Sequence, residues 1–171
     1  FCGGNSGRGL WLEEGGNHIF SGMRIDNGSR YGGPAYFLDN TQSNTFIQMR
    51  GEGAESDPFL HIKNSHSLTF IDASLPEIPY AVNANIIEIE NSHHIQFVSG
   101  RSGSQHAQGG TGKSIAIDVN SNYVRFRDFN ICTVGSAVDD VSNLSAGLVQ
   151  LDLLDGNAFS SFRNPPSGIR Y

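Results

Sequence analysis

Apolar and polar residues alternate along this chain in short runs that come in pairs. Leu60 and Ile62 are followed, after a polar stretch, by Leu68 and Phe70, and the same spacing returns in "IEIENSHHIQFVSG" at 87–100. Alternation with a period of two is typical of a β-strand that buries one face. Each pair of runs therefore predicts two short strands joined by a tight polar bend.

An asparagine marks the bend in four of these pairs, and a phenylalanine follows it six residues later. The pairs are Asn40 and Phe46, Asn64 and Phe70, Asn91 and Phe97, and Asn120 and Phe126. Successive asparagines are 24, 27 and 29 residues apart, and weaker copies lie at 12–23 and 153–162. Asparagine suits a bend because it tolerates positive φ and its amide bonds nearby backbone groups. The repeat is therefore strand, bend, strand and loop.

Such a unit cannot bury its apolar face alone, so we expect the units to stack with equivalent residues about 4.8 Å apart. The Asn-x5-Phe register resembles the right-handed parallel β-helix of the pectate-lyase-like superfamily, which includes polysaccharide lyases, hydrolases and phage tailspikes. The resemblance covers about residues 10–163 and implies an all-β solenoid of about six coils of 24–35 residues. An antiparallel sandwich is the competing fold. No signature of a specific enzyme family is present.

Two departures from the repeat carry predictions of their own. The alternation in "SIAIDVNSNYV" is displaced by one residue, which predicts a bulge or a shortened bend near Asn120. In an earlier unit Asn44 takes an inward position where other units have leucine, isoleucine or valine.

Composition supports the all-β class and excludes some classes of binding partner. The chain has 171 residues with 21 glycines and only 16% charged residues, which favours turns over long helices. This length suits one domain over residues 1–171, and the start at Phe1 suggests a processed product or a piece of a longer chain. The net charge of −6 argues against a nucleic-acid partner. The sequence contains no apolar run of about 18 residues, the length that would predict a membrane span, and no recognisable secretion signal.

Few residues have the spacing of a metal or disulfide site. Cys2 and Cys132 are predicted to be unlinked thiols, although the sequence leaves their pairing open. His93 and His94 make a weak metal site, because neighbours on a strand point to opposite faces. We expect no cofactor; Asp139 and Asp140 are weak candidates for binding a cation such as Ca2+.

An acidic row is expected on the outward side of the strands that precede the bends. Stacking places Asp39, Lys63 and Glu90 in consecutive coils, with His61 beside Glu88, and charge matching alone explains such a ladder. A catalytic interpretation notes that carboxyl groups in neighbouring coils lie about 5 Å apart, the spacing of retaining glycosidases, and in alternate coils about 9 to 10 Å, near the inverting range. The candidate catalytic residues are Glu88, Glu90, Asp118 and Asp152.

Two long inserts, 99–113 and 130–147, belong to adjacent units and are expected to form the walls of a groove. Basic side chains in these inserts and on the coils would bind a sugar polymer. The same residues are also expected in loops that are simply exposed to solvent. The candidate substrate-binding residues are His61, Lys63, Arg101, His106, Arg125 and Arg127.

These observations lead to two functional hypotheses. The first, implied largely by the resemblance, is an extracellular or virion-surface protein that binds and cleaves a polysaccharide through its outward carboxylates. The alternative is a non-catalytic adhesin or fibre module that binds glycans or assembles as a homotrimer. Fold alone does not decide between them.

Overall fold

The computed structural model describes residues 2–3, 9–26, 33–52, 58–75, 85–102, 115–118, 120–131, 141–142 and 149–152. Every regular element in these ranges is a β-strand, which confirms the all-β class. Within the same ranges no helix is long and apolar enough to cross a membrane.

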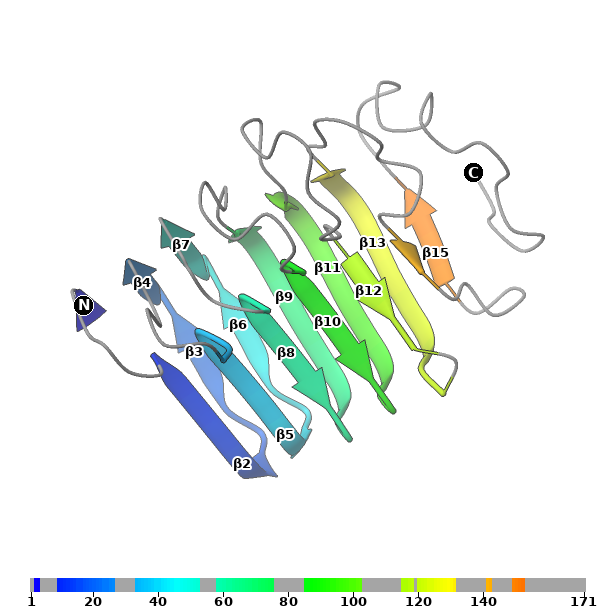
Figure 1. Cartoon of the computed structure of the whole chain (residues 1–171), viewed down its shortest axis with the longest axis horizontal. Helices are drawn as coiled ribbons and strands as arrows, with labels where there is room; N and C mark the ends of the chain where they lie inside the picture. Colours follow the sequence, from blue (N-terminus) through cyan, green and yellow to red (C-terminus); the bar gives the residue numbers. More distant parts are fainter. Residues whose placement is uncertain are drawn as a thin grey trace.

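The strands stack side by side in parallel and form a solenoid with two main sheets (Figure 1). The strands of the first sheet precede the bends: β2 (Leu10–Gly16), β5 (Tyr36–Gln42), β8 (Leu60–Lys63), β10 (Ile87–Glu90), β12 (Ile115–Ile117) and β14 (Val141–Ser142). The strands of the second sheet follow the bends: β3 (Ile19–Ser21), β6 (Thr45–Ile47), β9 (His66–Ser74), β11 (His93–Ser102), β13 (Asn122–Ile131) and β15 (Val149–Asp152).

A third, shorter row of strands continues from the second sheet. It contains β1 (Cys2–Gly3), β4 (Arg24–Asp26) and β7 (Arg50–Glu52), and it joins the end of β9 through the pair Arg50 and Ser74. The pairings among the described strands are parallel throughout, as the solenoid requires and an antiparallel sandwich does not allow.

The phenylalanines of the repeat form one continuous stack inside the solenoid. Ring centroids are 5.0 Å apart between Phe20 and Phe46, 4.9 Å between Phe46 and Phe70, 4.5 Å between Phe70 and Phe97, and 4.7 Å between Phe97 and Phe126. These separations match the spacing of paired strands, about 4.8 Å, because each ring comes from the next coil. The four Asn-x5-Phe phenylalanines are completely buried.

Asparagines occupy the bends as predicted. Asn40, Asn64 and Asn91 have φ of 52°, 47° and 43°, a region that most residues avoid. The side-chain amide of Asn91 donates to Asn64 Oδ1 at 2.8 Å, and that of Asn64 donates to Asp39 Oδ1 at 2.9 Å. The bends are therefore linked from coil to coil.

The next bend departs from this ladder. Ile89 pairs with Ile117 and His93 pairs with Asn122, so the later bend contains one more residue than the earlier one. The displaced alternation thus reflects an inserted residue, so of the two predicted alternatives the bulge is confirmed and the shortened bend is not. Asn120 donates at 3.4 Å to Asp118 in its own coil instead of reaching Asn91.

The inward position of Asn44 is confirmed. Its side chain is buried, and its Oδ1 accepts a hydrogen bond of 2.9 Å from the backbone N–H of His18. The buried amide thus bonds the backbone of the neighbouring coil.

Candidate functional site

The outward side of the first sheet carries two parallel rows of side chains. Strand register aligns the first row, here called the ring row: Trp11, Phe37, His61, Glu88 and Ala116. The second, the charged row, lies two residues further along each strand: Glu13, Asp39, Lys63, Glu90 and Asp118. Because successive residues of a strand point to opposite sides, both rows face away from the core.

Aromatic rings cover the early part of the ring row. The Trp11 and Phe37 centroids are 4.1 Å apart with the rings tilted by 38°, and Phe37 meets the edge of His61 at 5.2 Å. Trp11 retains 36% exposure although Phe37 packs against it. Neither ring was among the binding residues predicted from the sequence. The alignment of "LWLE" with "YFLD" could have indicated that the two rings lie side by side.

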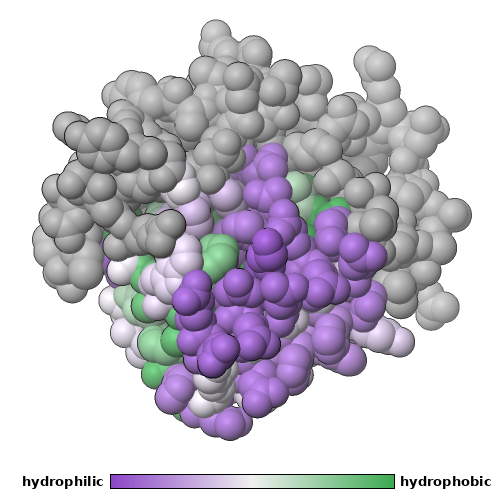
Figure 2. Space-filling view, turned by 60° about the horizontal axis from the view of Figure 1, so that its bottom comes forward, coloured by the Kyte–Doolittle hydropathy of each residue, from purple (hydrophilic) through white to green (hydrophobic). Residues whose placement is uncertain are grey.

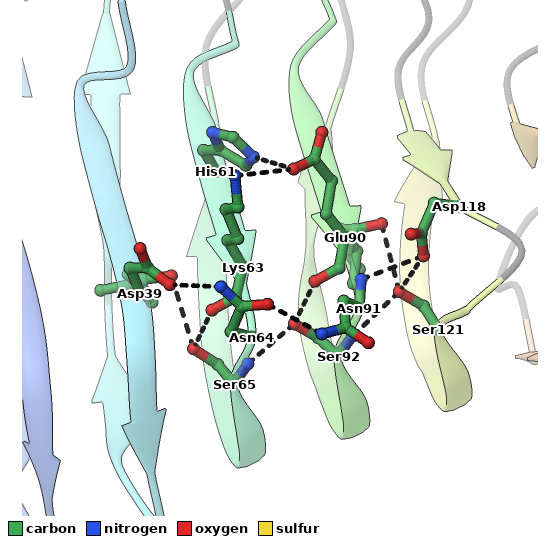
Figure 3. A network of polar contacts seen from close by, with 12 residues as sticks. Asp39, His61, Lys63, Asn64, Ser65, Glu90, Asn91, Ser92, Asp118 and Ser121 are labelled. Carbon is green, nitrogen blue, oxygen red and sulfur yellow. Dashed lines mark hydrogen bonds and ion pairs between the residues drawn. The ribbon is translucent and has the colours of Figure 1, made fainter.

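Glu90 makes two ion-pair contacts on this face (Figure 3). Its Oε2 lies 3.3 Å from His61 Nε2 and 3.7 Å from Lys63 Nζ. The contact with His61 is not aligned as a hydrogen bond, so it attracts only when the imidazole is protonated. His61 is in register with Glu88, as expected, but its ring nitrogen reaches Glu90 of the other row. The Lys63 and Glu90 ladder is confirmed.

Asp39 and Asp118 are both held by the bends. Asp39 Oδ1 accepts from the Asn64 amide at 2.9 Å. Asp118 Oδ1 accepts from the backbone N–H of Asn91 at 3.1 Å and from the Ser121 hydroxyl, while Oδ2 accepts from Asn120. Asp118 lies beside Glu90 in the neighbouring coil, since its N–H bonds Ile89 O. Its hydrogen bonds support the bend.

The structure separates other predicted site residues from this face. Asp152 is aligned with Arg127 on β13, so it lies in the second sheet, and its predicted place in one row with Glu90 and Asp118 was wrong. Arg125 and Arg127 are also in the second sheet. The alternation around Asp152 gives inward and outward positions but does not distinguish the two sheets.

Arg101 lies in a strand instead of the predicted loop wall. Ser99 to Ser102 continue β11, and Arg101 Nε donates to Ser74 Oγ at 2.9 Å. Gly100 permits this pairing, because a Cβ there would collide with the backbone of Ala73 and its φ is 122°. His106, Asp139, Asp140 and Cys132 lie outside the described residues, as does the side chain of Cys2.

Histidines form a second polar cluster where the second sheet begins. His66 stacks on His93 at 5.2 Å, His93 meets His94 edge to face at 5.4 Å, and His94 stacks on Tyr123 at 4.7 Å. Partial removal from water lowers the pKa of the His93 imidazole, and the nearby His66 and His94 lower it further. The described part of the chain contains no group of three side chains suited to a metal ion.

A buried ladder of hydroxyl groups lies behind the asparagines and was missed in the sequence. The backbone N–H of Thr41 donates to Ser65 Oγ at 3.2 Å, that of Ser65 to Ser92 Oγ at 3.0 Å, and that of Ser92 to Ser121 Oγ at 3.1 Å. All four side chains are buried. A serine or threonine directly follows each bend asparagine, and this was the available signal.

The bend side of the solenoid is predominantly hydrophilic (Figure 2). A polar pocket of about 390 Å³ opens there, next to the end of the charged row. Its lining residues are Glu14, Gly15, Asn40, Thr41, Gln42 and His66. The candidate site thus combines aromatic rings, carboxylates and a polar hollow at the end of one sheet.

Comparison with known proteins gives no relative from which a function could be transferred. No protein-family model matches the chain, and neither curated proteins nor solved structures give a match. The geometry of the face must therefore carry the functional argument.

Proposed function

We propose that the outward face of the first sheet binds an extracellular polysaccharide, and that the chain belongs to the pectate-lyase-like superfamily of right-handed β-helices. The observation that carries the proposal is the ring row lying beside the charged row on one regular sheet. Glycan sites pair apolar ring surfaces with a few well-placed polar groups, which is the combination on this face.

The chemistry of each row suits a sugar polymer. The apolar face of a sugar ring packs on an aromatic side chain, which the exposed Trp11, supported by Phe37, offers. Carboxylates and Lys63 in the neighbouring row exchange hydrogen bonds with hydroxyl groups. Because both rows run across successive coils, each presents one side chain about every 4.8 Å along the solenoid. A long, repetitive ligand fits such a face better than a small molecule does.

Cleavage is a second candidate activity, favoured by the neighbouring positions of Glu90 and Asp118. Carboxyl groups on paired strands lie about 5 Å apart, which is the retaining-glycosidase spacing. Asp118 is engaged by three hydrogen-bond donors of the bend, whereas the Glu90 side chain has 36% exposure and its ion-pair partners among the described residues, His61 and Lys63, lie on its own face. Glu90 is therefore the stronger candidate for a group that touches the substrate.

The proposal is tested by measuring affinity for a panel of neutral, amino and uronate polysaccharides, using affinity electrophoresis and calorimetry. We expect Trp11→Ala or Phe37→Ala to weaken binding by about tenfold, equivalent to about 1.4 kcal/mol. Tyr123→Ala is the matched control, because Tyr123 is an aromatic residue with 57% exposure on the second sheet. Equal losses in all three variants, or no binding by the wild type, would contradict the proposal.

The same samples distinguish a cleaving enzyme from a binding module. New reducing ends that form without the absorbance of an unsaturated product, and that disappear in Glu90→Gln, establish hydrolysis at this face. Binding without product, together with a trimeric mass in light scattering, identifies the adhesin or fibre alternative.

A further inference from the structure

We infer that the polysaccharide bound by this face carries free amino groups instead of carboxylates. This inference rests on the proposed glycan-binding function and adds the chemical class of the ligand. It follows from the charges of the face and from their position relative to the rings.

Carboxylates dominate the described outward side of the first sheet. The two rows contain five of them against one lysine, so five minus one leaves a net charge of −4 when His61 is neutral. Lys63, the one lysine, lies 3.7 Å from Glu90 and pairs with it. An anionic glycan would meet repulsion along most of this face, whereas an amine-bearing glycan would meet attraction.

The arginines of the described residues lie away from this face. Arg24 and Arg50 belong to the third row of strands, Arg101 extends along β11, and Arg125 and Arg127 lie on the second sheet. Arg50 is already paired with Asp72 at 2.9 Å, and Arg101 donates to Ser74. Apart from Lys63, the described strands of the first sheet thus carry no lysine or arginine that would offset a uronate polymer.

The carboxylates are placed to meet a substituent of a sugar stacked on the rings. Glu13 and Asp39 lie two residues beyond Trp11 and Phe37 on the same side of their strands, which is about 7 Å along the strand. Asp39 uses Oδ1 to accept from Asn64, and Oδ2 has no hydrogen-bond partner among the described residues. An ammonium group at the edge of the sugar would find an acceptor there.

The test compares three oligosaccharides of equal length by calorimetry at pH 6 and low salt: oligoglucosamine, oligo-N-acetylglucosamine and oligogalacturonate. Acetylation removes the positive charge and keeps the sugar backbone. We expect oligoglucosamine to bind at least tenfold more tightly than the acetylated form, with an advantage that shrinks as salt is added. Oligogalacturonate should bind most weakly.

Substitutions assign the effect to this face. Glu13→Gln and Asp39→Asn should each weaken oligoglucosamine binding several-fold more than they weaken binding of the acetylated form. Asp39→Asn keeps an oxygen that can accept from Asn64. Asp128→Asn is the control, because Asp128 is a half-exposed carboxylate on the second sheet.

The outcomes separate the two proposals. Equal affinity for the amino and acetylated oligosaccharides, or tighter binding of oligogalacturonate, overturns the inference and leaves glycan binding intact. An amine preference that persists in Glu13→Gln and Asp39→Asn also overturns it. Failure of all three oligosaccharides and of the wider panel overturns the proposed function itself.

Discussion

At the scale of single residues, the histidines show how neighbours change an individual side chain. Simple strand alternation predicts that His93 and His94 point to opposite faces, yet both are exposed, because His94 has a φ of 57° and the chain turns there. His93 then stacks on His66 and contacts His94. The third imidazole could have been predicted from the repeat, since His66 and His93 each follow a bend asparagine by two residues.

The stack predicts that acid destabilises the protein through His93. Its pKa in the folded state lies below the ordinary value of 6.5, so the unfolded chain binds a proton more readily. The contribution to stability is therefore complete above pH 6.5 and is lost as pH falls from 6.5 through the lowered folded pKa. Urea unfolding between pH 5 and 7.5 should show a smaller loss in His93→Gln than in the wild type. Identical pH profiles would contradict this.

At the scale of strands and bends, the sequence repeat predicted the structure of one coil, and the strand register of the structure shows which side chains meet between coils. Asn-x5-Phe correctly gave the bend, the buried phenylalanines and the parallel stacking. The same alternation failed for Asp152, because a period of two specifies the inside of a strand and not the sheet to which the strand belongs. The pairing of His61 with Glu90 was missed for a related reason: side-chain length lets it reach beyond its register partner.

The bend ladder predicts different costs for two substitutions of Asn91. Alanine would lose the amide bond to Asn64 and would strain a φ of 43°, so we expect a destabilisation of about 2 kcal/mol. Glycine would lose the bond but accept the backbone geometry, so we expect about 1 kcal/mol.

Chemical denaturation of Asn91→Ala and Asn91→Gly measures both values. A glycine variant that is as unstable as the alanine variant would contradict this prediction, because backbone strain would then make no contribution.

At the scale of the whole molecule, the solenoid gives different chemistry to its different sides. Aromatic rings and carboxylates gather on the first sheet, while Arg125 and Arg127 lie on the second and the histidine stack lies near the bends. Each coil contacts mainly its neighbours, so a surface row lengthens by one residue with each added coil. The described strands thus form an extended face that crosses several coils, which suits a polymer.

The most direct measurement of the central claim uses Trp11, the only tryptophan of the chain, which lies in the ring row. Its emission and its quenching by acrylamide are followed while oligoglucosamine or oligo-N-acetylglucosamine is added. We predict a saturable change in emission whose midpoint concentration equals the one measured by calorimetry. Quenching should fall because the sugar covers the indole. Calorimetric binding that leaves both the emission and the quenching of Trp11 unchanged would contradict a glycan site on this face.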